Sequence, residues 1–261
     1  MIALKIAATG MLAQQMRVEV IANNLANMNT TAYNPRRAEF TDLHYQQIQR
    51  AGTISAADGS ILPAGVQLGM GVKPSAISMD VAQGALKQTG GELDLAIEGA
   101  GYLEVALPSG GTGYTRDGAL KLTGDGQIVT SAGYPVMPDI TVPDDARDLS
   151  INADGEIYAY FQDQIDAQFI GQLTLAGFTN EKGLEAIGGN LYRETAASGT
   201  ARVGEAGKDG LGQFRQGYLE QSSVDPVREL TELIEAQRGY ELNAKVITAA
   251  DQMLSATTQI R

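Results

Sequence analysis

One histidine and a few aspartates beside glycines are the residues of this chain that could support acid–base or metal chemistry. His44 is followed by Tyr45 in a stretch without a regular apolar pattern. A catalytic base needs a partner side chain that orients it, and no Ser/His/Asp or Cys/His set can be assembled around His44. We therefore interpret His44 as a surface residue and expect no catalytic residue in this chain.

The aspartates have a simpler interpretation than a metal site. Those that could supply carboxylate ligands are Asp125, Asp154, Asp163 and Asp166. Their spacing does not match a calcium-binding EF-hand loop, and aspartate followed by glycine is ordinary turn chemistry. Gly69-Met-Gly71 resembles the start of a nucleotide-binding loop, but Pro74 follows and no helix opens behind it. We expect neither a metal nor a cofactor, while paired carboxylates of the glycosidase type stay open because they are set in space.

Composition argues against several other classes of protein. The net charge of -12 opposes binding to nucleic acid or to an anionic membrane surface. The chain has no cysteine, so disulfides, thiolate nucleophiles and cysteine metal sites are impossible. The hydrophobic content of 43% excludes wholesale disorder, and 31 glycines without any tryptophan indicate a turn-rich β structure.

The sequence predicts neither a secretory signal nor a membrane span. Lys5 is the only basic residue before Arg17, and polar residues interrupt the first apolar run. No stretch reaches the apolar length that crosses a bilayer. We expect a chain that is not membrane-embedded and that uses another exporter if it leaves the cytoplasm.

The elements that organise the chain are two helices at its ends. The last one begins at Asp225, which can cap the first turn, with Pro226 in the first helical position. It continues to Arg261 without another proline, and about 35 residues make a rod of roughly 50 Å. Its apolar stripe consists of Leu230, Leu233, Tyr240, Ala244, Ile247 and Leu254. Neighbouring faces are also apolar, so the arc is too wide for one helical partner.

The N-terminal segment carries a matching apolar arc. It includes Ile6, Ala13, Met16, Val20 and Leu25. The helix should end among asparagines that include Asn23, Asn24 and Asn27, because asparagine tolerates the left-handed backbone at helix ends. Amides inside a helical bundle can also fix register between subunits. Two helices with apolar surface left over predict an antiparallel or coiled pair that associates with further copies.

The chain between these helices has two parts. Residues 31–71 should be extended or irregular, because prolines and glycines interrupt them. For residues 45–65 the pattern alone favours a surface loop over an arm that folds against a neighbour. Residues 72–221 should form β-strands, with hairpin signals at Asp125-Gly126 and Asp154-Gly155 and a weaker one at Asp117-Gly118.

These elements predict an α+β fold. Long N- and C-terminal helices form a coiled-coil stem, and an extended arm and a mostly antiparallel β domain are inserted between them. The expected domains are a terminal helical domain (1–30 with 222–261), an arm (31–71) and a β-rich outer domain (72–221).

The residues around the end of the first helix are distinctive. Ala22-Asn-Asn-Leu-Ala-Asn-Met-Asn-Thr-Thr-Ala-Tyr33 resembles the N-terminal motif of the bacterial flagellar rod and hook protein family. Asp225-Pro-Val-Arg-Glu-Leu230 and Ala236-Gln-Arg-Gly-Tyr-Glu241 resemble the C-terminal motif of that family. With further motifs such as Leu62-Pro-Ala-Gly-Val-Gln-Leu-Gly-Met-Gly71, the likeness is greatest to the branch that builds the distal rod of the basal body.

The resemblance implies a structural subunit rather than an enzyme. Such subunits polymerise into a rigid hollow drive shaft that spans the periplasm, transmits motor torque to the hook and lets export substrates pass through its channel. The implied partners are further copies of the chain, the proximal rod proteins, the hook protein, the P-ring and L-ring bushing and the flagellar type III export apparatus. Export would proceed without a cleaved signal peptide.

The resemblance also implies roles for particular residues. A family segment that matches residues 45–65 is thought to brace adjacent subunits and stiffen the rod, which replaces the surface-loop interpretation. Its candidates here are Tyr45, Ile48, Ile54, Ile61, Leu62 and Pro63. The uncharged polar end of the last helix is a candidate lining for the channel. Its residues are Gln252, Ser255, Thr258 and Gln259.

This chain departs from the family pattern at two positions. Ala32 stands where the family usually has glycine, which puts a left-handed backbone there in doubt. Gly239 stands where the family usually has alanine, and a mid-helix glycine costs roughly 0.5–1 kcal/mol unless packing recovers it. Neither departure changes the assignment.

Other functions remain open at this stage. A proximal rod or hook subunit is an alternative within the same family. A peptidoglycan hydrolase on the β domain would need a cleft with a perturbed carboxylate. A small-molecule binding module has no supporting motif.

Overall fold

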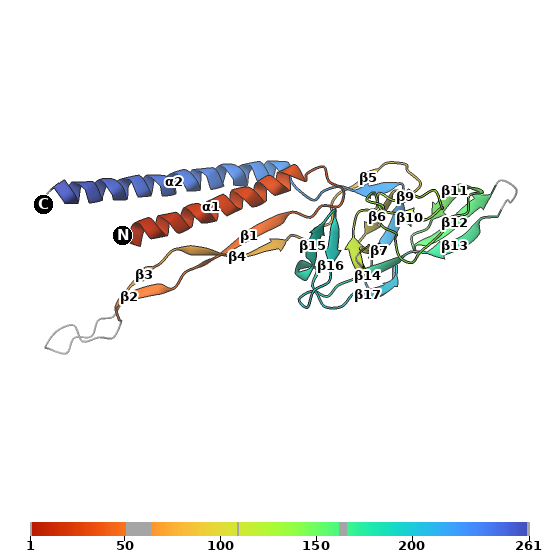
Figure 1. Ribbon diagram of the computed structural model, residues 1–261, viewed down its shortest axis with the longest axis horizontal. Coiled ribbons are helices and arrows are strands. Elements are labelled where there is room, and N and C mark those ends of the chain that lie inside the picture. Colours follow the sequence, from red (N-terminus) through yellow and green to blue (C-terminus); the bar gives the residue numbers. More distant parts are fainter. Residues whose placement is uncertain (1, 51–63, 109, 162–165, 260–261) are drawn as a thin grey trace. The chain divides into compact units, whose positions relative to one another are not determined.

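The structure is a computed structural model that describes residues 2–50, 64–108, 110–161 and 166–259. The chain divides into two compact units. The helical unit comprises Met1–Ala26, Arg36–Ser78 and Asp225–Arg261, and the β unit comprises Asn27–Pro35 and Met79–Val224. Figure 1 labels their elements.

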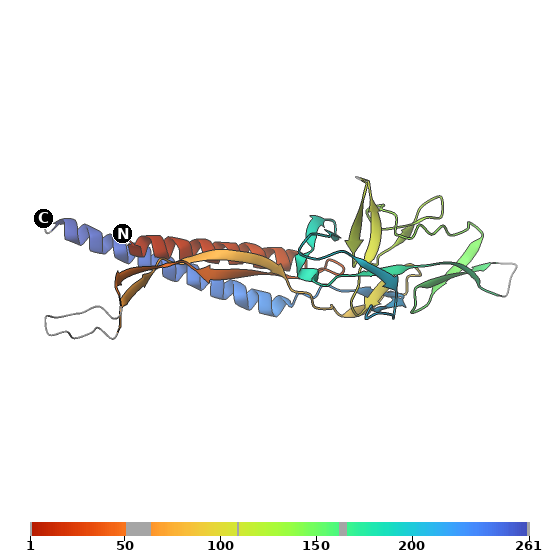
Figure 2. The ribbon, with the colours of Figure 1, turned by 90° about the horizontal axis from the view of Figure 1, so that it is seen from below.

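Two long helices dominate the helical unit: α1 (Ile2–Ala26) and α2 (Pro226–Gln259). Asp225 caps α2, because its Oδ1 accepts hydrogen bonds from the N–H groups of Val227 at 3.0 Å and Arg228 at 3.4 Å. The helices lie side by side and run in opposite directions, as both views show (Figures 1 and 2). The predicted helices at both ends of the chain are confirmed.

A narrow β ribbon accompanies the helices in the same unit. β1 (Arg36–Asp42) pairs with β4 (Val72–Met79), and β2 (Tyr45–Gln49) pairs antiparallel with β3 (Val66–Gly69). Along most of β1, half-buried residues alternate with exposed ones, as expected when one side of a strand rests on a helix. The described residues of the segment expected to be extended or irregular therefore form mainly paired strands.

One close contact between the ribbon and α1 involves Thr9. Thr9 Oγ1 in α1 accepts a hydrogen bond from the N–H of Val72 at 3.3 Å. Gly71 beside it has φ +113°, and a side chain there would overlap Thr9 Oγ1. Glycine is required at this position both for its backbone conformation and for the close approach to the helix.

The β unit consists of short strands and one turn of 3₁₀ helix. They are β5 (Leu86–Gln88), β6 (Leu95–Glu98), β7 (Leu103–Leu107), β8 (Gly111–Thr115), β9 (Lys121–Leu122), β10 (Ile128–Val129), β11 (Ala146–Ile151), β12 (Glu156–Phe161), β13 (Gln168–Gln172), β14 (Thr174–Gly177), η1 (Glu181–Gly183), β15 (Glu185–Gly188), β16 (Leu191–Arg193), β17 (Arg202–Glu205), β18 (Gln213–Gln216) and β19 (Tyr218–Glu220).

These strands pair antiparallel in several small sheets. The largest has the order β15-β16-β8-β7, and a three-stranded sheet has the order β11-β12-β13. Four further pairs are β14-β17, β18-β6, β19-β5 and β10-β9. The prediction of a mostly antiparallel β region between the helices is confirmed.

The core of the β unit forms where these sheets face one another. Fully buried side chains from several strands fill it, among them Leu95, Ile97, Leu103, Ile157 and Leu175. A second cluster is aromatic: Tyr102, Tyr114, Phe178 and Tyr192 pack with Met79 and Ala176. The ring of Tyr114 meets that of Phe178 edge-on, with centroids 4.8 Å apart. The β unit therefore has a hydrophobic core of its own.

Two of the three predicted hairpins are confirmed. Asp125-Gly126 lies between the paired strands β9 and β10, and Asp154-Gly155 lies between β11 and β12. The prediction at Asp117-Gly118 is wrong, because β8 before it pairs with β7 and β16 rather than with β9. Gly118 is needed for another reason, since a side chain there would overlap the carbonyl of Leu95.

Ala32 does adopt the left-handed backbone that its side chain disfavours. Its φ is +51°, and its side chain is buried. Its N–H donates a hydrogen bond to the carbonyl oxygen of Glu220 at 2.9 Å. The doubt raised by alanine at this position is thus resolved in favour of the left-handed conformation, which the surrounding β unit imposes.

Candidate self-assembly surfaces

The apolar side chains of α1 and α2 that are fully buried are mostly small. The buried apolar residues of the two helices are Ala7, Ala13, Ile21, Ala236 and Ala250. Arg17 on α1 adds ion pairs to Glu232 at 3.4 Å and Glu235 at 3.5 Å on α2. Because these pairs are partly exposed, they contribute little energy and mainly favour one relative position of the helices.

Asn24 joins three segments of the helical unit. Its Nδ2 donates to the carbonyl of Arg36 at 2.8 Å, and its Oδ1 accepts from the N–H of Arg36 at 2.9 Å. The same Nδ2 also lies 3.2 Å from Glu229 Oε2 on α2. Asn24 is 2% exposed, and its amide forms the hydrogen bonds that water would otherwise make with the backbone of Arg36, the first residue of β1. Asn24 therefore links α1, the ribbon and α2.

The side chain of Glu229 is half-buried, so its carboxyl group is partly removed from water. Burial raises the pKa of Glu229 above its ordinary value, and the hydrogen bond from Asn24 works in the opposite direction. Ionisation of Glu229 therefore costs the helix pair some stability.

The apolar residues predicted for assembly lie on the helices with different exposure. On α1, Ala13 is buried, and Ile6, Met16, Val20 and Leu25 are half-buried. On α2, Leu233, Ala244 and Ile247 are half-buried, and Leu230, Tyr240 and Leu254 are exposed. Asn23 is exposed and Asn27 is half-buried. Only part of the predicted apolar surface is covered within the chain.

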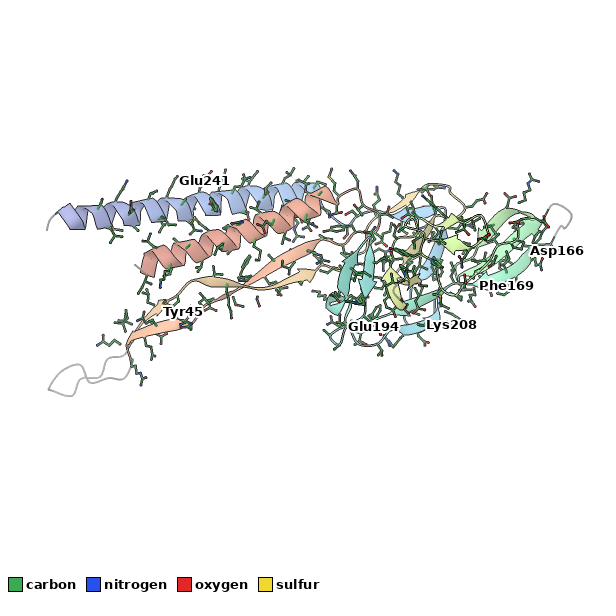
Figure 3. All side chains as sticks on the ribbon, viewed as in Figure 1. Tyr45, Asp166, Phe169, Glu194, Lys208 and Glu241 are labelled. Carbon is green, nitrogen blue, oxygen red and sulfur yellow. The ribbon has the colours of Figure 1, made fainter. Side chains whose placement is uncertain are left out.

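The ribbon extends this exposed apolar surface. Every residue of β2 is exposed, including Tyr45 and Ile48, and so are Val66 and Leu68 on β3. Figure 3 labels Tyr45 on this strand. The other candidates of the stiffening segment, Ile54, Ile61, Leu62 and Pro63, lie outside the described residues. Among the described residues, nothing covers the side chains of β2, and a two-stranded ribbon is only marginally stable by itself.

The candidate channel residues lie at the end of α2. Gln252 and Ser255 are exposed, and the Ser255 hydroxyl donates to the carbonyl of Gln252 at 2.9 Å. The side chains of Thr258 and Gln259 lie outside the described residues.

A buried ion pair anchors the β unit where the chain enters and leaves it. Arg116 Nε lies 2.7 Å from Glu220 Oε2, with side chains 6% and 2% exposed. Arg116 also donates to the carbonyls of Gly99 at 2.7 Å and Gly101 at 3.1 Å, and Glu220 Oε1 accepts from the N–H of Gly84 at 2.9 Å. Because both charges are paired and hydrogen-bonded, their desolvation is compensated.

The residues considered for chemistry do not form a site. His44, Asp125, Asp154 and Asp166 are exposed, and Asp163 lies outside the described residues. Among the described residues, no group of three His, Asp or Glu side chains could hold a metal ion. None of the helices in the described part of the chain has the length and apolar content to cross a membrane.

Two carboxylates of the β unit have perturbed acidity for structural reasons. Burial raises the pKa of Glu104, and the charge of Glu194 adds to this effect. Burial also raises the pKa of Asp117, whose Oδ1 accepts a hydrogen bond from the N–H of Ala119 at 3.1 Å. Both shifts are explained by packing and turn geometry.

Sequence reasoning missed two sets of contacts, one inside the β unit and one between the two helices. One is the Arg116–Glu220 pair, whose partners are far apart in the sequence and give no local signal. The other is a set of glycine–amide contacts between α1 and α2, described below. Its signal was present, because both helices contain a glycine followed four residues later by an amide, Gly10-Met-Leu-Ala-Gln14 and Gly239-Tyr-Glu-Leu-Asn243.

Three family models match this chain. Residues 4–33 match "Flagella basal body rod protein", residues 96–159 match "Flagellar hook protein FlgE/F/G D1 domain", and residues 215–260 match "Flagellar basal body rod FlgEFG protein C-terminal". The first and third cover the two terminal motifs.

Relatives match the chain over almost its full length. The "Flagellar basal-body rod protein FlgG" of Caulobacter vibrioides is 52% identical over 259 residues, which is 99% of each chain. The proteins of that name from Agrobacterium fabrum and Bacillus subtilis are 48% and 37% identical, over 98% and 97% of this chain and 98% and 96% of their own. A hook protein FlgE2 structure from Helicobacter pylori covers 72% of this chain and 43% of its own, with 18% identity and a TM-score of only 0.25. The sequence relatives establish that this chain belongs to the flagellar basal-body rod protein family, whose members are structural subunits of the rod.

Proposed function

We propose that this chain is the subunit of the distal rod, a hollow helical polymer that transmits motor torque to the hook and lets export substrates pass along its axis. The observation that carries the proposal is the exposed apolar surface of α2. Its exposed large hydrophobic residues are Val227, Leu230, Ile234, Tyr240, Leu242, Val246, Met253 and Leu254. An apolar surface of this extent on one helix is typical of an association site.

Repetition of one contact explains how such a subunit makes a tube. Each copy would place the exposed side of α2 and the ribbon against different neighbours, because the apolar arc is wider than one partner covers. A head-to-tail contact repeated by rotation and rise generates an open helical polymer. Torque then passes through many small interfaces at once.

The proposed polymer also assigns a role to each part of the chain. The paired termini act as a coiled-coil stem, the segment that includes β2 and β3 braces adjacent subunits, and the β-rich domain lies outside the stem. Gln252, Ser255, Thr258 and Gln259 line the channel, where uncharged polar groups offer weak contacts to passing unfolded chains. The neighbours in the finished structure are the proximal rod, the hook protein, the P- and L-rings and the export apparatus.

Two alternative functions, a different axial subunit of the same family and a peptidoglycan hydrolase, predict different experimental results. A proximal rod or hook subunit would polymerise too, and the position of the polymer along the axis distinguishes it. A peptidoglycan hydrolase would release soluble fragments from purified cell wall, and the proposal expects none.

Lysine substitutions on α2 test the proposal directly. In Ile234→Lys/Leu242→Lys, charges replace two exposed apolar side chains, so the subunit should keep its unfolding free energy within about 0.5 kcal/mol. Assembly should fail, as seen by sedimentation and electron microscopy. Gln237→Lys, at an exposed polar position on the same helix, is the matched control and should assemble. Tubes of normal yield from the double variant would overturn the proposal.

A further inference from the structure

Two reciprocal contacts between glycine and a side-chain amide join α1 and α2. A methyl group on Gly10 would lie 2.9 Å from Asn243 Nδ2, so the Asn243 amide rests directly on the Gly10 backbone. A methyl group on Gly239 would lie 3.1 Å from Gln14 Cδ, so the Gln14 amide rests on Gly239. Each helix thus supplies one glycine and one amide to this interface.

The two contacts are related by equal steps in opposite directions. Gln14 follows Gly10 by four residues on α1, and Gly239 precedes Asn243 by four residues on α2. The spacing of four residues places both members on the same side of their helix. The contact between Asn24 and Glu229 continues the same antiparallel alignment ten residues further along each helix.

Besides the partly exposed Arg17 ion pairs and the Asn24–Glu229 contact, the fully buried apolar side chains of the two helices carry little information about register. Apart from Ile21, these fully buried residues are alanines, whose small side chains distinguish poorly between neighbouring registers. Side chains of distinctive size or polarity are what distinguish one register from another. In this interface the glycines and the amides are such residues.

A slip by one helical turn is opposed in both directions. If α2 slides by four residues so that Asn243 lies opposite Gln14, two side-chain amides face each other in a space that holds one amide. If it moves the other way, Gly10 faces Gly239 and leaves a gap, while Gln14 meets Glu235. Only the observed register places each amide over a glycine.

The hydrogen bonding of Gln14 argues against a simple role in stability. Its Oε1 is buried and accepts no hydrogen bond from the described residues. A buried acceptor without a donor loses its interaction with water and gains none in return. A polar residue kept at such a cost is typical of positions that specify register.

We propose that Gly10, Gln14, Gly239 and Asn243 determine the register of α1 and α2. The Gln14 and Asn243 amides position the two helices relative to each other, and Gly239 and Gly10 provide the space into which these amides pack. This role concerns pairing within one chain and goes beyond self-assembly, so it can fail while the proposed function stands. It also explains why this chain has glycine at position 239, in the middle of a helix.

Distances between spin labels test the proposal in the full-length chain. Leu12 and Val227 are exposed on α1 and α2, and each is replaced by a labelled cysteine. In the observed register Leu12 lies opposite residue 241, so the two labels are offset by about 14 residues, roughly 21 Å along the axis, and their separation changes when one helix slides. Pulsed electron paramagnetic resonance should give one narrow distance distribution with the four residues intact. In Gln14→Ala/Asn243→Ala, a second population should appear, from chains in which the helices have slipped by one turn, roughly 5.4 Å along the axis.

Two further variants separate register from general stability. Gln15→Ala/Gln237→Ala removes exposed amides from the same helices and should keep the single distribution. The full exchange Gly10→Asn/Gln14→Gly/Gly239→Gln/Asn243→Gly moves both amides to the opposite helix and should also keep it. Each amide still rests on a glycine, and a slip again brings the two amides or the two glycines together. A broad distribution in the parent labelled chain overturns the proposal, and so does a single unshifted distribution in Gln14→Ala/Asn243→Ala.

Discussion

Ala32 shows how one residue can hold strain that its surroundings impose. Its φ of +51° is unfavourable for any residue with a Cβ atom, by roughly 1–2 kcal/mol. Ala32→Gly removes this cost but also removes a buried methyl group and makes the unfolded chain more flexible. We expect a net stabilisation of the β unit of about 0.5 kcal/mol, measured by urea unfolding.

A second alanine serves as the control for this prediction. Ala206 is 1% exposed and its φ is not positive, so Ala206→Gly should destabilise the β unit by about 1 kcal/mol. If both substitutions lower the urea midpoint equally, the backbone of Ala32 is not strained.

The buried ion pair is the second residue-scale feature with a measurable effect. Arg116→Ala leaves the Glu220 carboxylate buried without its cation, which should destabilise the β unit by about 3–5 kcal/mol. Arg215→Ala is the matched control, because Arg215 is 47% exposed and lies 3.6 Å from Glu98. It should cost less than about 1 kcal/mol. Equal shifts in the urea midpoint of the two variants would contradict this account.

Glu229 makes the stability of the helical unit depend on pH. Its folded pKa is raised by burial, so the folded state holds the proton more tightly than the unfolded state does. The contribution of Glu229 to stability is therefore greatest below the unfolded pKa, about 4.3, and is lost as the pH rises through the folded pKa. We expect Glu229→Gln to reduce this fall, measured as helix melting by circular dichroism from pH 4 to 8. Glu241→Gln, on the outer side of α2 (Figure 3), should leave the profile unchanged.

At the scale of elements, the ribbon's β2–β3 end is the part most dependent on neighbours. Ile48 is 65% exposed and Val66 is 50% exposed, so Ile48→Ser/Val66→Ser should barely change the unfolding of the isolated subunit. If this end braces adjacent copies, polymers of the variant should form but bend more than normal ones. Persistence length measured by electron microscopy checks this, and straight polymers would exclude a brace at these residues.

Prediction from sequence succeeded where local signals decide the structure. The start of α2 followed from Asp225 and Pro226, and the hairpin at Asp154-Gly155 followed from turn chemistry. The hairpin at Asp117-Gly118 failed because the glycine serves a distant contact, the close approach to Leu95. Long-range pairing of this kind is not encoded in adjacent residues.

The helix interface illustrates the same limit for the candidate site. The apolar stripes predicted that both helices associate, but the fully buried apolar side chains are mostly alanines, and amides pack on glycines between the helices. A hydrophobic pattern weights large side chains, whereas close helix packing selects small ones. Repetition of glycine and an amide at a spacing of four residues was the available signal.

At the scale of the whole molecule, the two units differ in how much of their surface is internally buried. The β unit has fully buried side chains such as Tyr102, Leu103 and Ile157, whereas Ala236 and Ala250 are the buried residues among the described side chains of α2. Local stability follows buried contacts, and most stability of an amphipathic helix comes from packing. The isolated subunit should therefore open at α2 well before the β unit unfolds.

Hydrogen exchange followed by mass spectrometry measures this difference. In the isolated subunit, amides of α2 should exchange many times faster than those of β7 and β12, because opening of the helix exposes little apolar surface. In assembled polymers, α2 should become strongly protected, since neighbours then cover the side that carries Ile234 and Leu242. The β unit serves as the internal control, because its core is complete in both states. Equal protection of α2 and the β unit in the isolated subunit would mean that the helix is stabilised within one chain, and the physical basis for assembly through α2 would be lost.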